Sequence, residues 1–297
     1  MLKIIVKKAI NYFGFDVSKI ERRENIYFQK DAWEHQEKHL LPFHKEGMLV
    51  IDIGAGGTPS PIASILTDYY PDDSVHRSKS VDESKPLVIC SVESMPFKNN
   101  IFDLSICSHV LEHVSTPELA ASEISRISIS GYVETPAYGK DTLIGTADMH
   151  EWQVVENCGC LHFFPYTKRQ KEANKNSPFM NIWSQKKYHP LQQFFWERTD
   201  VFNVNYIWHE SMQVVAHRKS ESGPKNSLKS AWQPIDQSRL PNTSPLLTAN
   251  EIQLLEKCLV APDGFSNMKY SEGSFWNEDG STQYPVRGKR VYFELGR

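Results

Sequence analysis

The stretch LVIDIGAGGTPSP, residues Leu49–Pro61, decides the fold that we predict for this chain. Its apolar start is typical of a strand buried on both faces of a parallel sheet. Glycines follow at once, and glycine adopts positive φ angles and lets a ligand touch the backbone. Pro59 and Pro61 stand where a helix would begin, so we expect that helix to be short or irregular. The stretch therefore predicts a ligand-binding loop at the carboxyl end of a first strand.

The segments downstream repeat this strand-and-loop pattern. We expect further short strands at residues 64–70, 86–91, 102–108 and 130–136, and a helix at 117–127. Alternation of this kind predicts an α/β fold with a doubly wound, mostly parallel sheet. Asp68 ends the second predicted strand, beside the glycine loop. A carboxylate at this place in nucleotide-binding folds accepts hydrogen bonds from two ribose hydroxyls, so Asp68 favours a nucleotide-like ligand.

Composition narrows the classes of function. The chain has 297 residues and a net charge of -3, which disfavours a nucleic-acid partner. No apolar run approaches the roughly 20 residues of a membrane-spanning helix. Five cysteines without framework spacing favour a reducing compartment, and we expect a cytoplasmic protein.

The chain divides into four predicted parts. Residues 1–45 form an N-terminal helical segment, 46–218 the main domain with an insert at about 138–198, 219–247 a linker, and 248–297 a small appendage. The insert contains a predicted hairpin that turns at residues 157–159, and residues 201–217 look like an antiparallel strand pair. The apolar face of the N-terminal helix predicts packing on the domain; the alternative is a peripheral contact with a membrane.

A second group of motifs, downstream of the glycine loop, indicates which kind of ligand the loop binds. The loop reads Asp52-Ile53-Gly54-Ala55-Gly56 and is followed by Glu93-Ser94-Met95-Pro96-Phe97, Phe102-Asp103 and Leu111-Glu112-His113. In this order and spacing the motifs resemble the class I S-adenosylmethionine-dependent methyltransferases, in particular the type 11-like group. The resemblance covers about residues 47–136. It implies a Rossmann-like sheet of seven strands with a reversed hairpin at its edge.

The resemblance also implies a set of donor-binding residues. S-adenosylmethionine would lie across the carboxyl ends of the first, second and fourth strands, with Asp68 on the ribose. The implied contacts are Asp52, Gly54, Ala55, Gly56, Asp68, Ser91, Val92, Glu93, Ser108 and His109. Ser91 departs from the family, many of whose members carry an aspartate there for the adenine amine.

Candidate catalytic residues follow from the chemistry of methyl transfer. A sulfonium leaves as a neutral group and needs no acid, whereas an oxygen acceptor often needs a base. We expect this base among His109, Glu134 and His150, and we expect Glu112 and His113 to be structural. An alternative zinc site would use Cys158, Cys160, His162 and His150. Structural zinc ligands are usually separated by two to four residues, so we predict a hairpin with two thiols and no metal centre.

The sequence therefore predicts an S-adenosylmethionine-dependent methyltransferase that acts on a small molecule or a glycan. Two alternatives stay open. One is a catalytically inactive binding or partner subunit with the same fold. The other is an NAD-dependent oxidoreductase, which would show a fuller glycine fingerprint followed directly by a helix.

Overall fold

The computed structural model describes residues 39–40, 42–70, 80–145, 149–175, 177, 194, 198–218, 240, 246–262 and 266–293. The predicted N-terminal helical segment and the predicted linker fall almost entirely outside these residues. The membrane contact of the N-terminal helix therefore stays a prediction. Among the described residues, no helix is long and apolar enough to cross a bilayer. All five cysteines are free thiols.

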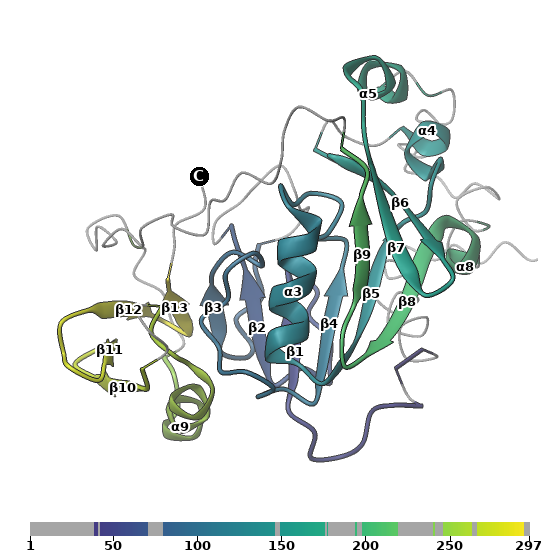
Figure 1. Ribbon diagram of the computed structural model, residues 1–297. Coiled ribbons are helices and arrows are strands. Elements are labelled where there is room, and N and C mark those ends of the chain that lie inside the picture. The colour runs from purple at the N-terminus through teal and green to yellow at the C-terminus, as the bar shows by residue number, and fades with distance from the viewer. Residues whose placement is uncertain are drawn as a thin grey trace, which may run out of the picture.

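A parallel sheet forms the centre of the molecule (Figure 1). Its strands are β1 (Val50–Ile53), β2 (Ile65–Asp68), β3 (Leu87–Ile89), β4 (Leu104–Ser108) and β5 (Ser130–Pro136). They lie in the order β3-β2-β1-β4-β5 with parallel neighbours throughout. The strand order reverses between β1 and β4, because β2 and β3 extend the sheet on one side and β4 and β5 on the other. Open α/β sheets bind ligands at such a point, outside the carboxyl ends of the strands.

Helix α3 (Pro117–Ile127) connects β4 to β5 and lies across the sheet face in Figure 1. Pro117 occupies its first turn, where the missing N–H costs no hydrogen bond. One stripe of the helix is buried, and it consists of Pro117, Ala120, Ala121, Ile124 and Ile127. The predicted strands and this helix are therefore confirmed, including the irregular connection after β1: residues 54–64 contain no helix.

The insert forms a second, three-stranded sheet. Strands β6 (Trp152–Asn157) and β7 (Cys160–Pro165) make the predicted hairpin, and its turn residues Cys158 and Gly159 both have positive φ angles of 53° and 78°. Two left-handed residues are what a type I′ turn requires. Three short helices accompany this region: α4 (Lys140–Ile144), α5 (Lys168–Lys175) and α8 (Thr199–Phe202).

The predicted strand pair at 201–217 is wrong in its pairing. β8 (Asn203–His209) runs antiparallel to β5 at the edge of the large sheet, whereas β9 (Gln213–Ala216) joins β7 in the small sheet. Glu210 has a φ angle of 66°, and the amide of Met212 donates to Ser125 on α3. The chain thereby turns away from β8 and passes α3, and β9 then pairs with β7.

The C-terminal appendage extends the sheet to ten strands, beyond the seven that the resemblance implies. It begins with α9 (Ala249–Cys258), whose first turn Thr248 and Glu251 cap reciprocally. Four strands follow: β10 (Met268–Ser271), β11 (Ser274–Asn277), β12 (Gln283–Arg287) and β13 (Arg290–Tyr292). β12 and β13 form a terminal hairpin, and β13 pairs in parallel with β3. The appendage thus covers an edge that would otherwise be open.

Candidate functional site

A pocket of about 280 Å³ opens at the carboxyl ends of β1, β2, β3 and β4, on the side where the strand order reverses. The wall is formed by the ends of β1 and β2 and by the segments that follow β3 and β4. The lining residues are Ile53, Gly54, Gly56, Thr67, Asp68, Tyr69, Tyr70, Cys90, Ser91, Val92, Glu93, His109, Val110, His113, Val114 and Ser115. The structure therefore brings most of the predicted donor-binding residues together in one cavity.

The glycine loop forms the floor of this pocket. Gly54 and Gly56 have φ angles of 70° and 55°, and a Cβ on Gly54 would lie 2.3 Å from Cγ2 of Val110. The loop needs glycine at position 54 for both its backbone conformation and its close packing. In place of a helix, Lys85 holds the end of the loop, since its Nζ donates to the carbonyl oxygens of Pro61 and Ala63.

Asp68 ties the loop to the second strand. Its Oδ2 accepts a hydrogen bond from the amide of Gly56 at 3.1 Å, and its Oδ1 accepts one from the amide of Tyr70 at 2.8 Å. The side chain is buried, yet it lines the pocket. A carboxylate is an acceptor only, so a ligand that meets Asp68 in this cavity would do so with a donor such as a hydroxyl.

Three of the predicted contacts lie behind the pocket wall. Asp52 is buried, and its Oδ2 accepts from the amide of Ser60 at 2.6 Å. Burial raises the pKa of Asp52 to about 6, against the lowering effects of that amide and of Lys85. Ala55 donates its amide to the carbonyl of Thr67, and Ser108 ends β4 without lining the cavity. Asp52 and Ala55 therefore fix the shape of the loop.

The segment that follows β3 brings the predicted contacts Ser91, Val92 and Glu93 to the pocket. Glu93 is engaged by the protein, because its Oε1 accepts the amide of Thr116 at the start of α3. Burial raises the pKa of Glu93, partly offset by that amide hydrogen bond. Ser91 Oγ accepts from the amide of Glu93 at 3.2 Å. Tyr69 and Tyr70, which follow Asp68, line the same cavity and were not predicted.

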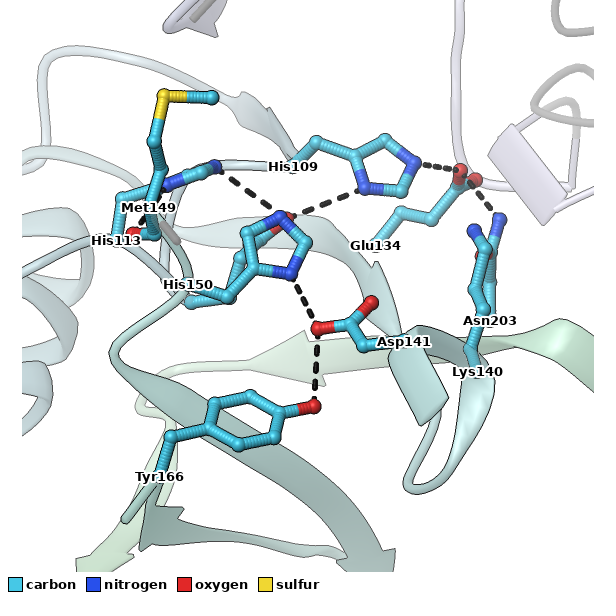
Figure 2. Close-up of polar contacts among 10 residues, drawn as sticks. His109, His113, Glu134, Lys140, Asp141, Met149, His150, Tyr166 and Asn203 are labelled. Carbon is cyan, nitrogen blue, oxygen red and sulfur yellow. Dashed lines mark hydrogen bonds and ion pairs between the residues drawn. The ribbon is translucent and has the colours of Figure 1, made fainter. Parts of the chain in front are cut away.

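A polar cluster adjoins the pocket (Figure 2). His109 lies at its entrance with a φ angle of 56° and with 43% of its side chain exposed. Its Nδ1 is 3.2 Å from Glu112 Oε1, and its Nε2 is 3.1 Å from Glu134 Oε1. Desolvation lowers the pKa of His109, but the hydrogen bonds to the two carboxylates outweigh it and raise the pKa to about 9. The ring is therefore protonated at neutral pH.

Glu134 joins this cluster to the edge strand β8. Besides His109, its carboxylate accepts from the hydroxyl of Tyr132 at 2.6 Å and from Asn203 Nδ2 at 2.9 Å. A carboxylate that accepts several donors is stabilised as the anion. Glu134 is thus a positioning group for His109 in this structure.

His150 approaches the cluster from the insert. Its Nδ1 lies 2.5 Å from Oδ2 of Asp141, and the hydroxyl of Tyr166 donates to the same oxygen at 2.9 Å (Figure 2). The backbone carbonyl of Glu112 accepts the amides of Glu151 and Trp152 at 2.8 and 3.2 Å, which fixes the segment. Asp141 and Tyr166 were not predicted, since no sequence motif links them to residues near β4.

The four-ligand zinc alternative is wrong. His150 pairs with Asp141, while Nδ1 of His162 lies 3.0 Å from Nε2 of His217. Cys158 lies in the exposed turn of the hairpin. Within the described residues, the grouping of potential metal ligands that the structure does bring together is Glu112, His113 and His150.

Comparison with known proteins agrees with this architecture. Residues 52–132 match the protein family described as "Methyltransferase domain". An uncharacterized protein from Methanocaldococcus jannaschii is 30% identical over 113 residues, which cover 37% of this chain and 50% of that protein. The chain thus spans about half the length of the curated relative that it matches.

Solved structures with weaker similarity include one bacterial and one archaeal protein. YcgJ from Bacillus subtilis is 20% identical, with 35% of this chain and 52% of that chain covered and a TM-score of 0.28. An S-adenosylmethionine-dependent methyltransferase from Methanosarcina mazei is 16% identical, with 34% and 57% covered and a TM-score of 0.26. Residues 52–132 thus match a methyltransferase domain, and the strand order and glycine loop described above lie within or beside this matched region.

Proposed function

We propose that the chain is an S-adenosylmethionine-dependent methyltransferase whose acceptor is a hydroxyl-bearing small molecule or glycan. The observation that carries this proposal is the pocket at the carboxyl ends of β1 to β4, with Gly54 and Gly56 on its floor and Asp68 in its wall. We assign the activity to residues 46–218, with the insert at 138–198 forming the acceptor side, and we assign the appendage the role of covering the sheet edge.

The residues in the pocket fit the donor. The positive φ angles of Gly54 and Gly56 give the loop a shape that residues with a Cβ rarely adopt, and at Gly54 a Cβ would also collide with Val110. Asp68 would accept hydrogen bonds from the ribose hydroxyls, because its carboxylate lines the pocket and acts only as an acceptor. Ser91 and Val92 would flank the adenine. When bound, S-adenosylmethionine supplies an electrophilic methyl group on a sulfonium that leaves as a neutral thioether.

The polar cluster assigns roles on the acceptor side. His109 is protonated at neutral pH and donates its two N–H groups to Glu112 and Glu134, so we assign it the role of a fixed positive charge in the wall of the pocket. Glu134 positions His109. The Nδ1 of His150 faces the Asp141 carboxylate, which cannot donate, so Nδ1 carries the proton and Nε2 keeps its lone pair. We propose that this lone pair activates the acceptor hydroxyl.

The charge of the cluster supports a neutral acceptor group. Glu112, Glu134 and Asp141 are buried carboxylates close together in the fold. The protonated His109 and Lys140 lie beside these carboxylates and offset much of their charge, so the cluster suits an uncharged acceptor, and sugar or alcohol hydroxyls can donate to the carboxylates. A hydroxyl acceptor also has the greatest need for activation.

Donor binding tests the proposal most directly. Isothermal titration of the full chain with S-adenosylhomocysteine should give one site per chain with a dissociation constant in the micromolar range. The matched comparison is NAD in the same buffer, with melting temperature as the second readout. The proposal is overturned if millimolar S-adenosylhomocysteine does not bind, or if NAD alone raises the melting temperature. Methyl transfer from labelled donor to a panel of polyols, phenols and oligosaccharides then tests the acceptor class.

A further inference from the structure

Two histidines and a glutamate meet beside the donor pocket. One potential ligand atom from each of Glu112, His113 and His150 lies within 4.8 Å of the others. Glu112 and His113 follow β4, whereas His150 precedes β6, so the fold brings together two distant segments. The rings of His113 and His150 are 4.7 Å apart between centroids and nearly perpendicular, as Figure 2 shows.

Hydrogen bonds fix which nitrogen of each ring can act as a ligand. Nδ1 of His113 lies 3.1 Å from the carbonyl oxygen of Met149, and Nδ1 of His150 lies 2.5 Å from Asp141 Oδ2. A carbonyl and an ionised carboxylate only accept, so each Nδ1 carries the hydrogen and each neutral ring has its lone pair on Nε2. Metal-binding histidines are held in this way, with the second nitrogen donating to a carbonyl or carboxylate.

Glu112 supplies an independent observation that points to a ligand. The side chain is 1% exposed, and its Oε1 lies 3.2 Å from His109 Nδ1 and 3.9 Å from His113 Nε2. Its Oε2 is buried without a hydrogen-bond partner among the residues that the structure describes. A buried carboxylate oxygen left unsatisfied is costly, and such an atom often marks a bound ion or water.

We propose that Glu112, His113 and His150 bind a divalent transition-metal cation of the Zn²⁺, Co²⁺ or Mn²⁺ type. Two imidazoles and one carboxylate are a ligand set that these cations favour and that leaves coordination positions open. Asp141 orients His150 from the second shell of ligands, and Tyr166 orients Asp141. With a cation bound, Nε2 of His150 would be a ligand, and the cation would take over from the imidazole in activating the acceptor hydroxyl.

The role of the cation in the reaction rests on the proposed function, in which an acceptor hydroxyl receives the methyl group. An acceptor hydroxyl that reaches the cation has its pKa lowered and releases its proton to solvent. Two neighbouring hydroxyls, as on a sugar, would suit the open positions better than a single amine. The site itself stands on Glu112, His113 and His150, whatever the acceptor.

Metal binding can be measured without any activity. The full-length protein is stripped with chelator, and Co²⁺ is added while visible absorption is recorded, with Zn²⁺ titrated by calorimetry in parallel. We expect one cation per chain and d–d bands typical of nitrogen and oxygen ligands. His150→Asn should weaken binding at least 10-fold, and Asp141→Asn should weaken it about 10- to 100-fold as a second-shell change. Circular dichroism confirms that each variant is folded.

His162→Asn is the matched control, because His162 pairs with His217 on the small sheet and lies outside the cluster. The proposal is overturned if the stripped protein binds no cation, or if His150→Asn and His162→Asn bind it equally well. Titration with S-adenosylhomocysteine on the same samples separates the two proposals. Metal binding with no donor binding overturns the methyltransferase assignment alone, and donor binding without metal binding overturns the metal site alone.

Discussion

The amide of Gly56 donates a hydrogen bond to Oδ2 of Asp68 at 3.1 Å, so the glycine loop after β1 is fastened to the end of β2 by the side chain that lines the pocket. The amide of Tyr70 holds the other oxygen of the same carboxylate. The carboxylate of Asp68 thus fixes the shape of the loop and also lines the pocket. This double role makes Asp68 the most informative position on the donor side.

Asp68→Ala should weaken binding of S-adenosylhomocysteine by about 1–3 kcal/mol, or roughly 5- to 150-fold, because hydrogen bonds to a charged group are lost. Calorimetric titration measures the change. Asp279→Ala removes an exposed aspartate of the appendage that accepts from Ser281, and it should leave donor affinity unaltered. Unchanged affinity in a folded Asp68→Ala protein would show that the carboxylate does not contact the donor.

Gly54→Ala and Gly139→Ala separate backbone strain from packing. Both glycines have positive φ angles, 70° and 87°, so each substitution should destabilise the fold by about 1 kcal/mol. Only Gly54 has a neighbour in the way, since its Cβ would lie 2.3 Å from Val110, whereas nothing lies within 4 Å at Gly139. Gly54→Ala should therefore also reduce donor affinity, and adding Val110→Ala should restore part of it. Urea unfolding measures the loss of stability, and calorimetry measures donor affinity. An equal donor affinity of Gly54→Ala and Gly139→Ala would contradict the packing argument.

The donor side of the site could be predicted because its residues are local to strands. A parallel strand that is buried on both faces reads as a continuous apolar run, and its carboxyl end is marked by the polar residue or glycine that follows. Gly54, Asp68 and Ser91 each stand directly after such a run. Parallel pairing then brings these strand ends together at one edge without further information.

The acceptor side could not be predicted in the same way. Asp141 and Tyr166 reach His150 through contacts within the irregular insert. The hydrophobic periodicity of the sequence does not predict such contacts. Glu112 and His113 were interpreted as structural because a turn after β4 explains them locally. β13 pairs with β3 across about two hundred residues of sequence, and short apolar strands carry no signal for their partner.

Asp52 predicts how stability depends on pH. Burial raises its pKa to about 6 in the folded chain, whereas the ordinary value is 3.8. Between about pH 4 and pH 6 the folded state holds a proton that the unfolded state has lost, so the free energy of unfolding falls as the pH rises. Asp52→Asn cannot titrate. Its stability relative to the natural chain should rise by up to about 3 kcal/mol from pH 4 to pH 7. Urea unfolding at both pH values tests this, and a constant difference would place the pKa of Asp52 near its ordinary value.

The last prediction concerns the attachment of the appendage. Nε and Nη2 of Arg290 on β13 lie 3.0 and 2.7 Å from Oε1 of Glu83, and the two side chains are only 9% and 16% exposed. Arg290→Ala leaves a largely buried carboxylate without its partner, which should destabilise the chain by about 3 kcal/mol. The double variant Glu83→Gln with Arg290→Met removes both charges. Its free energy of unfolding should fall by less than that of Arg290→Ala alone. Arg198→Ala breaks the exposed pair with Asp200 and should have no measurable effect. Thermal and urea unfolding rank the variants; a loss for Arg290→Ala no greater than for Arg198→Ala would mean that strand pairing alone holds β13 against β3.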